Sequence, residues 1–89
     1  MRAVVSVIGS DTVGIIAEVS SLCKKYNLNI LDITQSVLQD LFAMIMLVDI
    51  KDASAHIGEI REAFEKYGEE NHLSVHVMHE DIFNSMHRI

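Results

Sequence analysis

Two glycines separated by four residues, Gly9 and Gly14, enclose the segment G-S-D-T-V-G, a pattern that invites comparison with phosphate-binding loops. A phosphate loop needs a Lys and a Ser or Thr directly after its last glycine, to reach the phosphates and Mg²⁺. Ile15 and Ile16 stand in those places, and the dinucleotide fingerprint G-x-G-x-x-G fails as well. The sequence therefore predicts no nucleotide cofactor at this loop.

The histidines raise the question of a metal site. His76 and His79 lie three residues apart, with Glu80 and Asp81 directly behind them. This spacing matches no standard zinc pattern, and alternate positions of a strand face solvent by default, so we expect no native metal site. Catalytic residues are not predicted either, because no Ser-His-Asp or Cys-His spacing stands out. Cys23, the single cysteine, lies on a helical apolar stripe, which favours a buried structural thiol over a reactive one.

Composition limits the class of protein. The chain of 89 residues has room for one domain, residues 1–89, and its 49 % hydrophobic and 22 % charged content is that of a folded protein. No stretch approaches the ~18 apolar residues of a membrane helix, and the first apolar run is too short for a signal peptide, so we expect a cytoplasmic protein. A net charge of −6 argues against nucleic-acid binding, which needs clustered Lys and Arg.

Apolar periodicity predicts the elements that position these residues. Residues 2–8 are short and β-branched, which indicates a strand. Apolar residues from 15 to 26 have helical spacing, and Asn27 is a stop signal. Residues 30–38 and 41–50 then form an apparent hairpin around Gln39 and Asp40, with Leu31, Ile33 and Val37 expected on one face of the first strand.

A second helix, a strand and a short helix complete the chain. Apolar residues at 57, 60, 64 and 67 mark the second helix, with Asp52 or Ser54 available to cap its start and Gly68 near its end. Residues 73–77 alternate as a last strand. After it come the apolar residues of an expected short amphipathic helix: Ile82, Phe83, Met86 and Ile89.

An internal repeat supports this order. At an offset of 41, Ile16 matches Ile57, Lys25 matches Lys66 and Tyr26 matches Tyr67, as if two β-α-β units were related; Glu18–Glu59 and Val19–Ile60 continue the match. Two such units interleaved give an α+β, ferredoxin-like βαββαβ fold: a four-stranded antiparallel sheet with both helices on one face, here with a short C-terminal helix added.

Two of the expected strands are apolar on both faces. Ala3–Ile8 and Leu41–Val48 do not alternate with polar residues, although the face of such a sheet that lacks helices ordinarily meets water. Either the C-terminal segment or a second copy of the chain must cover that face, and we expect a homodimer or a higher homo-oligomer. An Asp in place of Met44, which shares a face with Phe42 and Met46, is expected to weaken this assembly.

The sequence resembles the ACT domain family, whose members are small ligand-sensing modules of amino-acid metabolism. The resemblance rests on D-T-V-G-I-I-A-E-V (residues 11–19), similar to the family's D-R-P-G loop, on N-L-N-I-L-D-I (residues 27–33), similar to its G-x-N-I strand entry, and on the element order. Within this family, the sequence is similar to short free-standing ACT proteins and to the ACT modules of formyltetrahydrofolate deformylase and the glycine-cleavage repressor.

The resemblance implies a ligand site shared by two subunits. It would lie between the first loop of one subunit, with Asp11, Thr12, Val13 and Gly14, and Asn29 at the second strand of its neighbour. Thr12-Val13 replaces the family's Arg-Pro, which changes the loop's rigidity. Two plainer alternatives stay open: Asp11 or Thr12 as a helix cap, and Asn29 as a turn residue.

The function that follows is a non-catalytic regulatory module. It would bind a small metabolite, with an amino acid as the implied ligand, and modulate a partner enzyme or regulator. A small enzyme on the same fold and a purely structural assembly module are the alternatives.

Overall fold

The computed structural model describes residues 1–10 and 13–86, so Asp11, Thr12 and Ile89 lie outside the described residues. The described chain forms four strands and three helices: β1 (Arg2–Gly9), α1 (Ile15–Lys25), β2 (Asn29–Leu38), β3 (Leu41–Asp49), α2 (Ile57–Glu70), β4 (Ser74–His79) and α3 (Glu80–Met86). This is the predicted βαββαβ order with a C-terminal helix.

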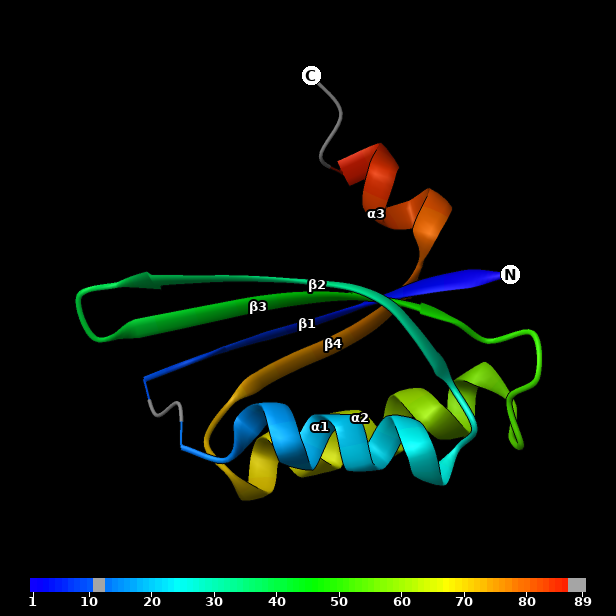
Figure 1. Cartoon of the computed structure of the whole chain (residues 1–89), viewed down its shortest axis with the longest axis horizontal. Helices are drawn as coiled ribbons and strands as arrows, with labels where there is room; N and C mark the ends of the chain where they lie inside the picture. The colour runs from blue at the N-terminus through cyan, green and yellow to red at the C-terminus, as the bar shows by residue number, and fades with distance from the viewer. Residues whose placement is uncertain (11–12, 87–89) are drawn as a thin grey trace.

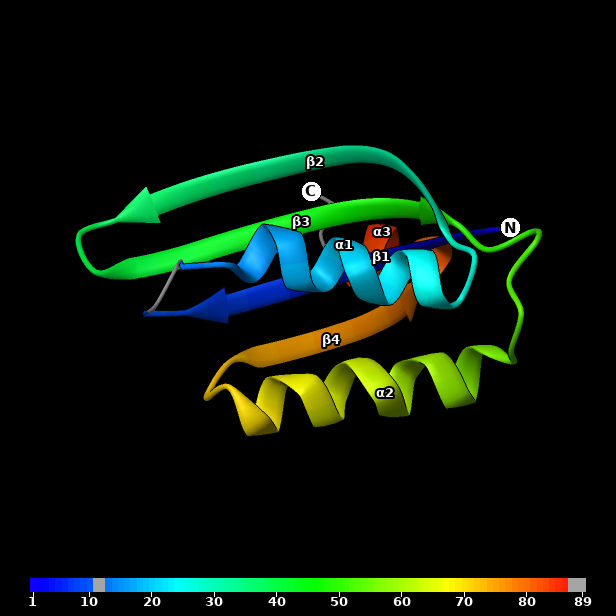
Figure 2. The ribbon, with the colours of Figure 1, turned by 60° about the horizontal axis from the view of Figure 1, so that its bottom comes forward.

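The four strands form one antiparallel sheet in the order β2-β3-β1-β4, which confirms the ferredoxin-like fold. Helices α1 and α2 lie side by side on one face, and α3 stands on the opposite face (Figures 1 and 2). Strands β2 and β4 are therefore the two edges of the sheet.

The main core lies between the sheet and the two long helices. Its centre is fully buried and combines residues from both halves of the chain: Val5, Val7, Val19, Met44, Met46, Val48, Ile60 and Phe64. Met44 belongs to this core, so the prediction that placed it at a subunit interface was wrong. The alternation of β3 correctly grouped Phe42, Met44 and Met46, but that face is the one covered by the helices.

The other face of the sheet, called the outer face below, is also apolar. It consists of the alternate residues of the central strands and their neighbours: Val4, Ser6, Ile8, Ala43, Ile45 and Met78. Val4 is 4 % exposed beneath α3, whereas Ile8 and Ile45 are 41 % and 40 % exposed. The prediction that β1 and β3 are apolar on both faces is confirmed.

Two local details differ from the predictions. The pairing of β2 with β3 shifts between Ile30 and Asp32, so Leu31 is an extra residue of a β-bulge instead of one of a regular row. Helix α2 is capped by the backbone of His56, not by Asp52 or Ser54. The Ser54 N–H instead donates to the Tyr26 carbonyl (2.9 Å), which ties the loop to the end of α1.

Candidate functional site

The loop between β1 and α1 leads into the start of α1 at one end of the sheet. Gly14 is the N-cap residue of α1, with φ 75°, a left-handed conformation that favours glycine. Its carbonyl accepts the Glu18 N–H at 2.9 Å, and no described side chain caps the helix. The first-turn N–H groups therefore carry the positive end of the helix dipole, an arrangement suited to a carboxylate.

A shallow hollow adjoins this loop. Its polar groups come from α1 and from the end of α2, and it is lined by Val13, Ile15, Glu18, Tyr67, Asn71 and Leu73. Its volume of about 40 Å³ is close to the ~30 Å³ share of one water molecule in the liquid. Within one subunit, the loop end thus offers a surface for part of a ligand and no enclosed site.

Glu18 and Tyr67 form the main polar contact of this hollow. The Tyr67 hydroxyl donates to Glu18 Oε1 at 3.0 Å. Burial, followed by the hydrogen bond and the negative charge of Glu18, raises the pKa of Tyr67 to about 12. Neither residue was predicted to belong to the site. Both take part in the internal repeat of the sequence, but the repeat does not indicate that their side chains are in contact.

Asn29 lies at the opposite end of the sheet. It is the first residue of β2, opposite Asp49 of β3, so the alternative that made Asn29 a turn residue was wrong. Asn27 makes the turn, with φ 57°, and its side-chain amide donates to the Asp52 carbonyl at 2.9 Å. A hollow of about 200 Å³ opens here, lined by Asn27, Leu28, Asn29, Asp49 and Asp52.

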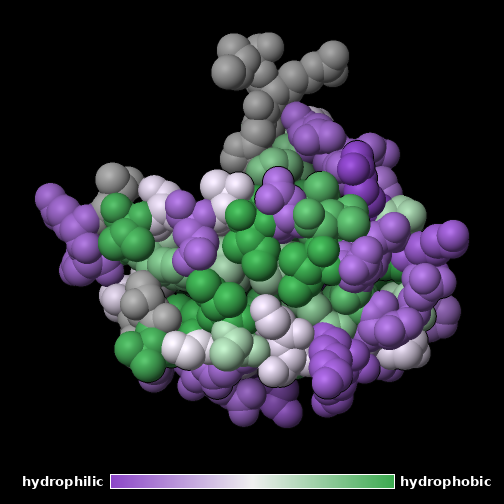
Figure 3. Space-filling model, in the orientation of Figure 1, coloured by the Kyte–Doolittle hydropathy of each residue, from purple (hydrophilic) through white to green (hydrophobic). Residues whose placement is uncertain are grey.

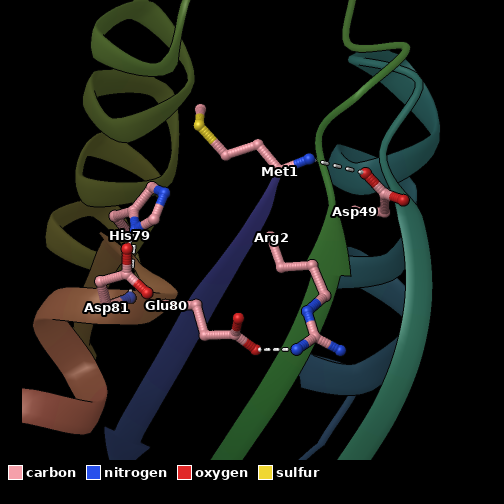
Figure 4. Close-up of polar contacts among 6 residues, drawn as sticks. All are labelled: Met1, Arg2, Asp49, His79, Glu80 and Asp81. Atoms are coloured by element: carbon pink, nitrogen blue, oxygen red, sulfur yellow. Dashed lines mark hydrogen bonds and ion pairs between the residues drawn. The ribbon is translucent and has the colours of Figure 1, made fainter.

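Two carboxylates give this second hollow a negative character. Asp49 lies 3.7 Å from the terminal amine of Met1, and its Oδ1 accepts the Lys51 N–H at 2.9 Å (Figure 4). The Asp52 side chain is exposed at the rim. Carboxylates and an amide are suited to an ammonium group, which neutralises the charge and donates hydrogen bonds.

The predicted site residues are therefore not brought together within one chain. Val13 and Gly14 lie at the start of α1 and Asn29 just beyond its end, and the ribbon places them at opposite ends of the molecule (Figure 1). An 11-residue helix spans about 16 Å at 1.5 Å per residue. Asp11 and Thr12 belong to the same loop but lie outside the described residues.

The other candidate residues play structural or surface roles. Cys23 is buried with its Sγ 3.7 Å from Met46 Sδ, and burial raises the pKa of its thiol to about 11. Within residues 1–10 and 13–86, no three His, Cys, Asp or Glu side chains are grouped as a metal site would require. In the same part of the chain, no helix is long and apolar enough to cross a membrane.

The fold places the chain among the ferredoxin-like α+β domains, and the sequence shows which of them it is. The pattern of the ACT domain matches residues 2–78, so the chain belongs to the ACT domain family, whose members are typically regulatory ligand-binding domains. Among similar proteins are a UPF0237 protein of Methanopyrus kandleri, 52 % identical over 99 % of this chain and 98 % of its own, and one of Clostridium perfringens, 47 % identical over all of both.

Solved structures agree with this assignment. An ACT domain protein from Streptococcus pneumoniae is 34 % identical, with a TM-score of 0.81 over 93 % of both chains. A formyltetrahydrofolate deformylase from Pseudomonas syringae (23 % identity, TM-score 0.78) is matched by 88 % of this chain but over only 27 % of its own length. A putative glycine cleavage system transcriptional repressor (22 %, 0.71) is matched over 43 % of its length. These last two show the fold alone.

Proposed function

We propose that this chain is a non-catalytic regulatory domain that binds an amino acid between two copies of itself and thereby modulates a partner enzyme or regulator. The observation that carries the proposal is the division of the site. One end of the sheet offers helix N–H groups beside Gly14 that no described side chain caps, and the other offers Asn29 with two carboxylates. Neither hollow alone matches both charged ends of an amino acid.

The two sheet edges differ in a way that favours one mode of pairing. Helix α2 packs along β4, and Arg61 Nε donates to the Val77 carbonyl of that strand at 3.0 Å. In β2, by contrast, the Ile33 N–H donates to Asp32 Oδ1 of the same strand at 2.9 Å, so this bond brings no other element onto that edge. We therefore place the second copy against β2, with antiparallel pairing between the two β2 strands.

This pairing completes the site by symmetry. A two-fold axis through the middle of β2 exchanges the two ends of the strand. Asn29 of one copy then lies at the same end of the extended sheet as the Gly14 loop of the other copy. The dimer holds two equivalent sites, each with one loop and one strand entry.

The charges assign the ends of the ligand. The carboxylate would accept hydrogen bonds from the first-turn N–H groups of α1. The ammonium would donate to Asn29 and lie near Asp49 and Asp52 of the other copy, with Asp11 as a further acceptor from the loop. Glu18, already bonded to Tyr67, closes the side of the loop and disfavours ligands with a second negative charge there.

A thermal-shift screen with the amino acids and common metabolites is the first test, because a ligand of the native state raises the melting temperature by mass action. Calorimetric titration of variants with the best hit then tests the site. Asn29→Ala and Asp11→Ala should each weaken binding by about 10- to 150-fold, as expected for one hydrogen bond to a charged group of about 1.5 to 3 kcal/mol. Gly14→Val should weaken it more, because a side chain there blocks backbone approach.

The matched control is Asn84→Ala, an exposed asparagine of α3 far from both hollows, which should leave affinity unchanged. Unchanged affinity in both Asn29→Ala and Asp11→Ala would contradict the site. If Asp11→Ala lowers only the stability, by about 1 kcal/mol, the loop is a helix cap and nothing more. Turnover of a substrate by the pure protein would favour an enzyme, and stable assembly with no ligand found in the screen would favour a structural module.

A further inference from the structure

The outer face carries more apolar surface than residues 1–10 and 13–86 cover. Ile8 and Ile45 are about two-fifths exposed at its centre, and Leu41 is 46 % exposed at the hairpin end. In Figure 3, which views the sheet close to edge-on, hydrophobic side chains lie across the middle of the molecule, with hydrophilic side chains around them. Soluble monomers rarely leave a contiguous apolar patch of this kind open, so the face requires a partner.

Helix α3 is an incomplete cover for this face. It has seven residues, none of them buried, and Ile82 and Met86 are 53 % and 66 % exposed. Its start is held by the ion pair between Arg2 Nη2 and Glu80 Oε2 at 2.7 Å (Figure 4). Isolated helices shorter than about 12 residues are marginal in water, so a helix this short and this exposed needs more packing than the described residues provide.

An apolar hollow lies between α3 and the sheet. Its volume is about 250 Å³, and its apolar walls come from both elements: Ile8, Ile45, Met78, Phe83 and Met86. Ser6 and His76 are its polar groups. The protruding side chains of α3 thus stand beside a recess of matching chemistry, an arrangement that can be self-complementary.

We propose that the outer face is an interface with a second copy of this chain, in which α3 of each copy lies over the hollow of the other. Charge favours this occupant. The central part of the face has no charged side chain, and the nearest ones form its rim: Arg2, Asp32, Asp49 and Glu80. An apolar centre with a polar rim is typical of protein interfaces, and the net charge of −6 disfavours nucleic acid or an anionic membrane.

The size of the face fits the same occupant. With strands of eight and nine residues and four strands about 4.8 Å apart, the sheet spans on the order of 500 Å². Part of this area is already covered by α3 in each copy, so two such faces reach the ~1,000 Å² at which specific interfaces begin only with the contribution of the exposed side chains of α3, Ile82 and Met86.

This interface is separate from the β2 pairing of the proposed function, and either can exist without the other. With both, the chain forms a tetramer with perpendicular two-fold axes, about 40 kDa from subunits of 10.0 kDa. With the outer-face contact alone, it forms a dimer of about 20 kDa.

Sedimentation of two matched variants tests the inference. Ile45→Asp places a charge at the centre of the outer face, and Ile16→Asp places one on α1, where the isoleucine is also 40 % exposed. At micromolar concentration, Ile45→Asp should sediment at half the mass of the wild type and Ile16→Asp at the full mass. A folded Ile45→Asp protein of unchanged mass, or a monomeric wild type, would overturn the inference.

Thiol labelling gives a second measurement that does not depend on the charged variants folding. Cys23 is buried, so a cysteine introduced at position 45 or 16 is the only reactive one among the described residues. Alkylation of Ile45→Cys should slow at least tenfold between nanomolar and high micromolar protein, whereas Ile16→Cys should react at one rate throughout. Equal, concentration-independent rates at both positions would contradict a second copy on the outer face.

Discussion

The two faces of the sheet are built from the same kinds of residue in the same strands, yet they differ in what covers them. In β3, Met44 is fully buried by the helices while its neighbour Ile45 is 40 % exposed. The helix-covered face is complete within one chain, and the outer face is closed only in part by α3 (Figure 1). One side of this sheet therefore serves folding, and the other remains available for assembly.

The largest effect expected from this difference is on stability, when a charge is introduced at one of two adjacent positions of β3, one on each face. Met44→Asp places an unpaired carboxylate in the core, and we expect a loss of more than about 4 kcal/mol in unfolding free energy, enough to unfold a domain of this size. Ile45→Asp should retain the helical circular dichroism of the wild type. A Met44→Asp protein that melts cooperatively like the wild type would contradict the division of the faces.

The next prediction compares two glycines of α2. A Cβ at Gly68 would meet the Leu73 carbonyl oxygen and Val75 Cγ2, both at 2.8 Å, whereas one at Gly58 meets no heavy atom within 4 Å. Gly68→Ala should therefore lower the unfolding free energy by about 1 to 3 kcal/mol. Gly58→Ala should raise it by about 0.5 to 1 kcal/mol, because alanine favours the helix. Urea unfolding measures both, and equal effects would show that α2 does not pack on β4 as described.

A smaller effect is expected where α3 is attached to the outer face. Arg2→Ala removes the ion pair with Glu80, whose partners are 51 % and 22 % exposed. Such a surface pair contributes about 0.2 to 1 kcal/mol and is screened by salt. The stability difference between Arg2→Ala and the wild type should shrink as NaCl is raised to 1 M. A difference that persists in high salt would mean that Arg2 acts through packing instead of charge.

The smallest effect concerns pH and the Glu18–Tyr67 contact on the helix side. Since folding raises the pKa of Tyr67 from 10.0 to about 12, this residue contributes stability that is complete below pH 10 and is lost as the pH rises towards 12. Tyr67→Phe should lack that contribution. The difference in unfolding free energy between the wild type and Tyr67→Phe should therefore narrow from pH 9 to pH 11. A constant difference would contradict a coupling between Tyr67 ionisation and stability.

Most of the fold was predictable because helix and strand periodicities are local. The sequence could group Phe42, Met44 and Met46 on one face, but it could not show which face the helices cover when both are apolar. That choice depends on how the two crossovers return to the sheet. The β-bulge at Leu31 and the His56 cap were missed for a similar reason, since backbone bonds such as that from Ser54 to Tyr26 join segments far apart in the sequence.

The candidate site was predictable only in its parts. The left-handed conformation of Gly14 fits the glycine at the helix start, and its role in ligand binding stays a prediction. The contact of Glu18 with Tyr67 was not predicted, since it joins residues 49 positions apart. The acidic hollow around Asn29 was also missed, because Asp49 and Asp52 approach it from the end of another strand and the loop beyond.

The bond from Arg61 to the Val77 carbonyl has a consequence for how far assembly can proceed. An edge strand with a free backbone is a template onto which further strands can add, and a sheet open at both edges has no natural end to that growth. Arg61 bonds to one outward carbonyl of β4 and α2 packs along that strand, which disfavours strand addition on this side. In the proposed dimer, two-fold pairing would use up the β2 edge as well, so the assembly would be closed and would have no free edge from which a fibre could grow.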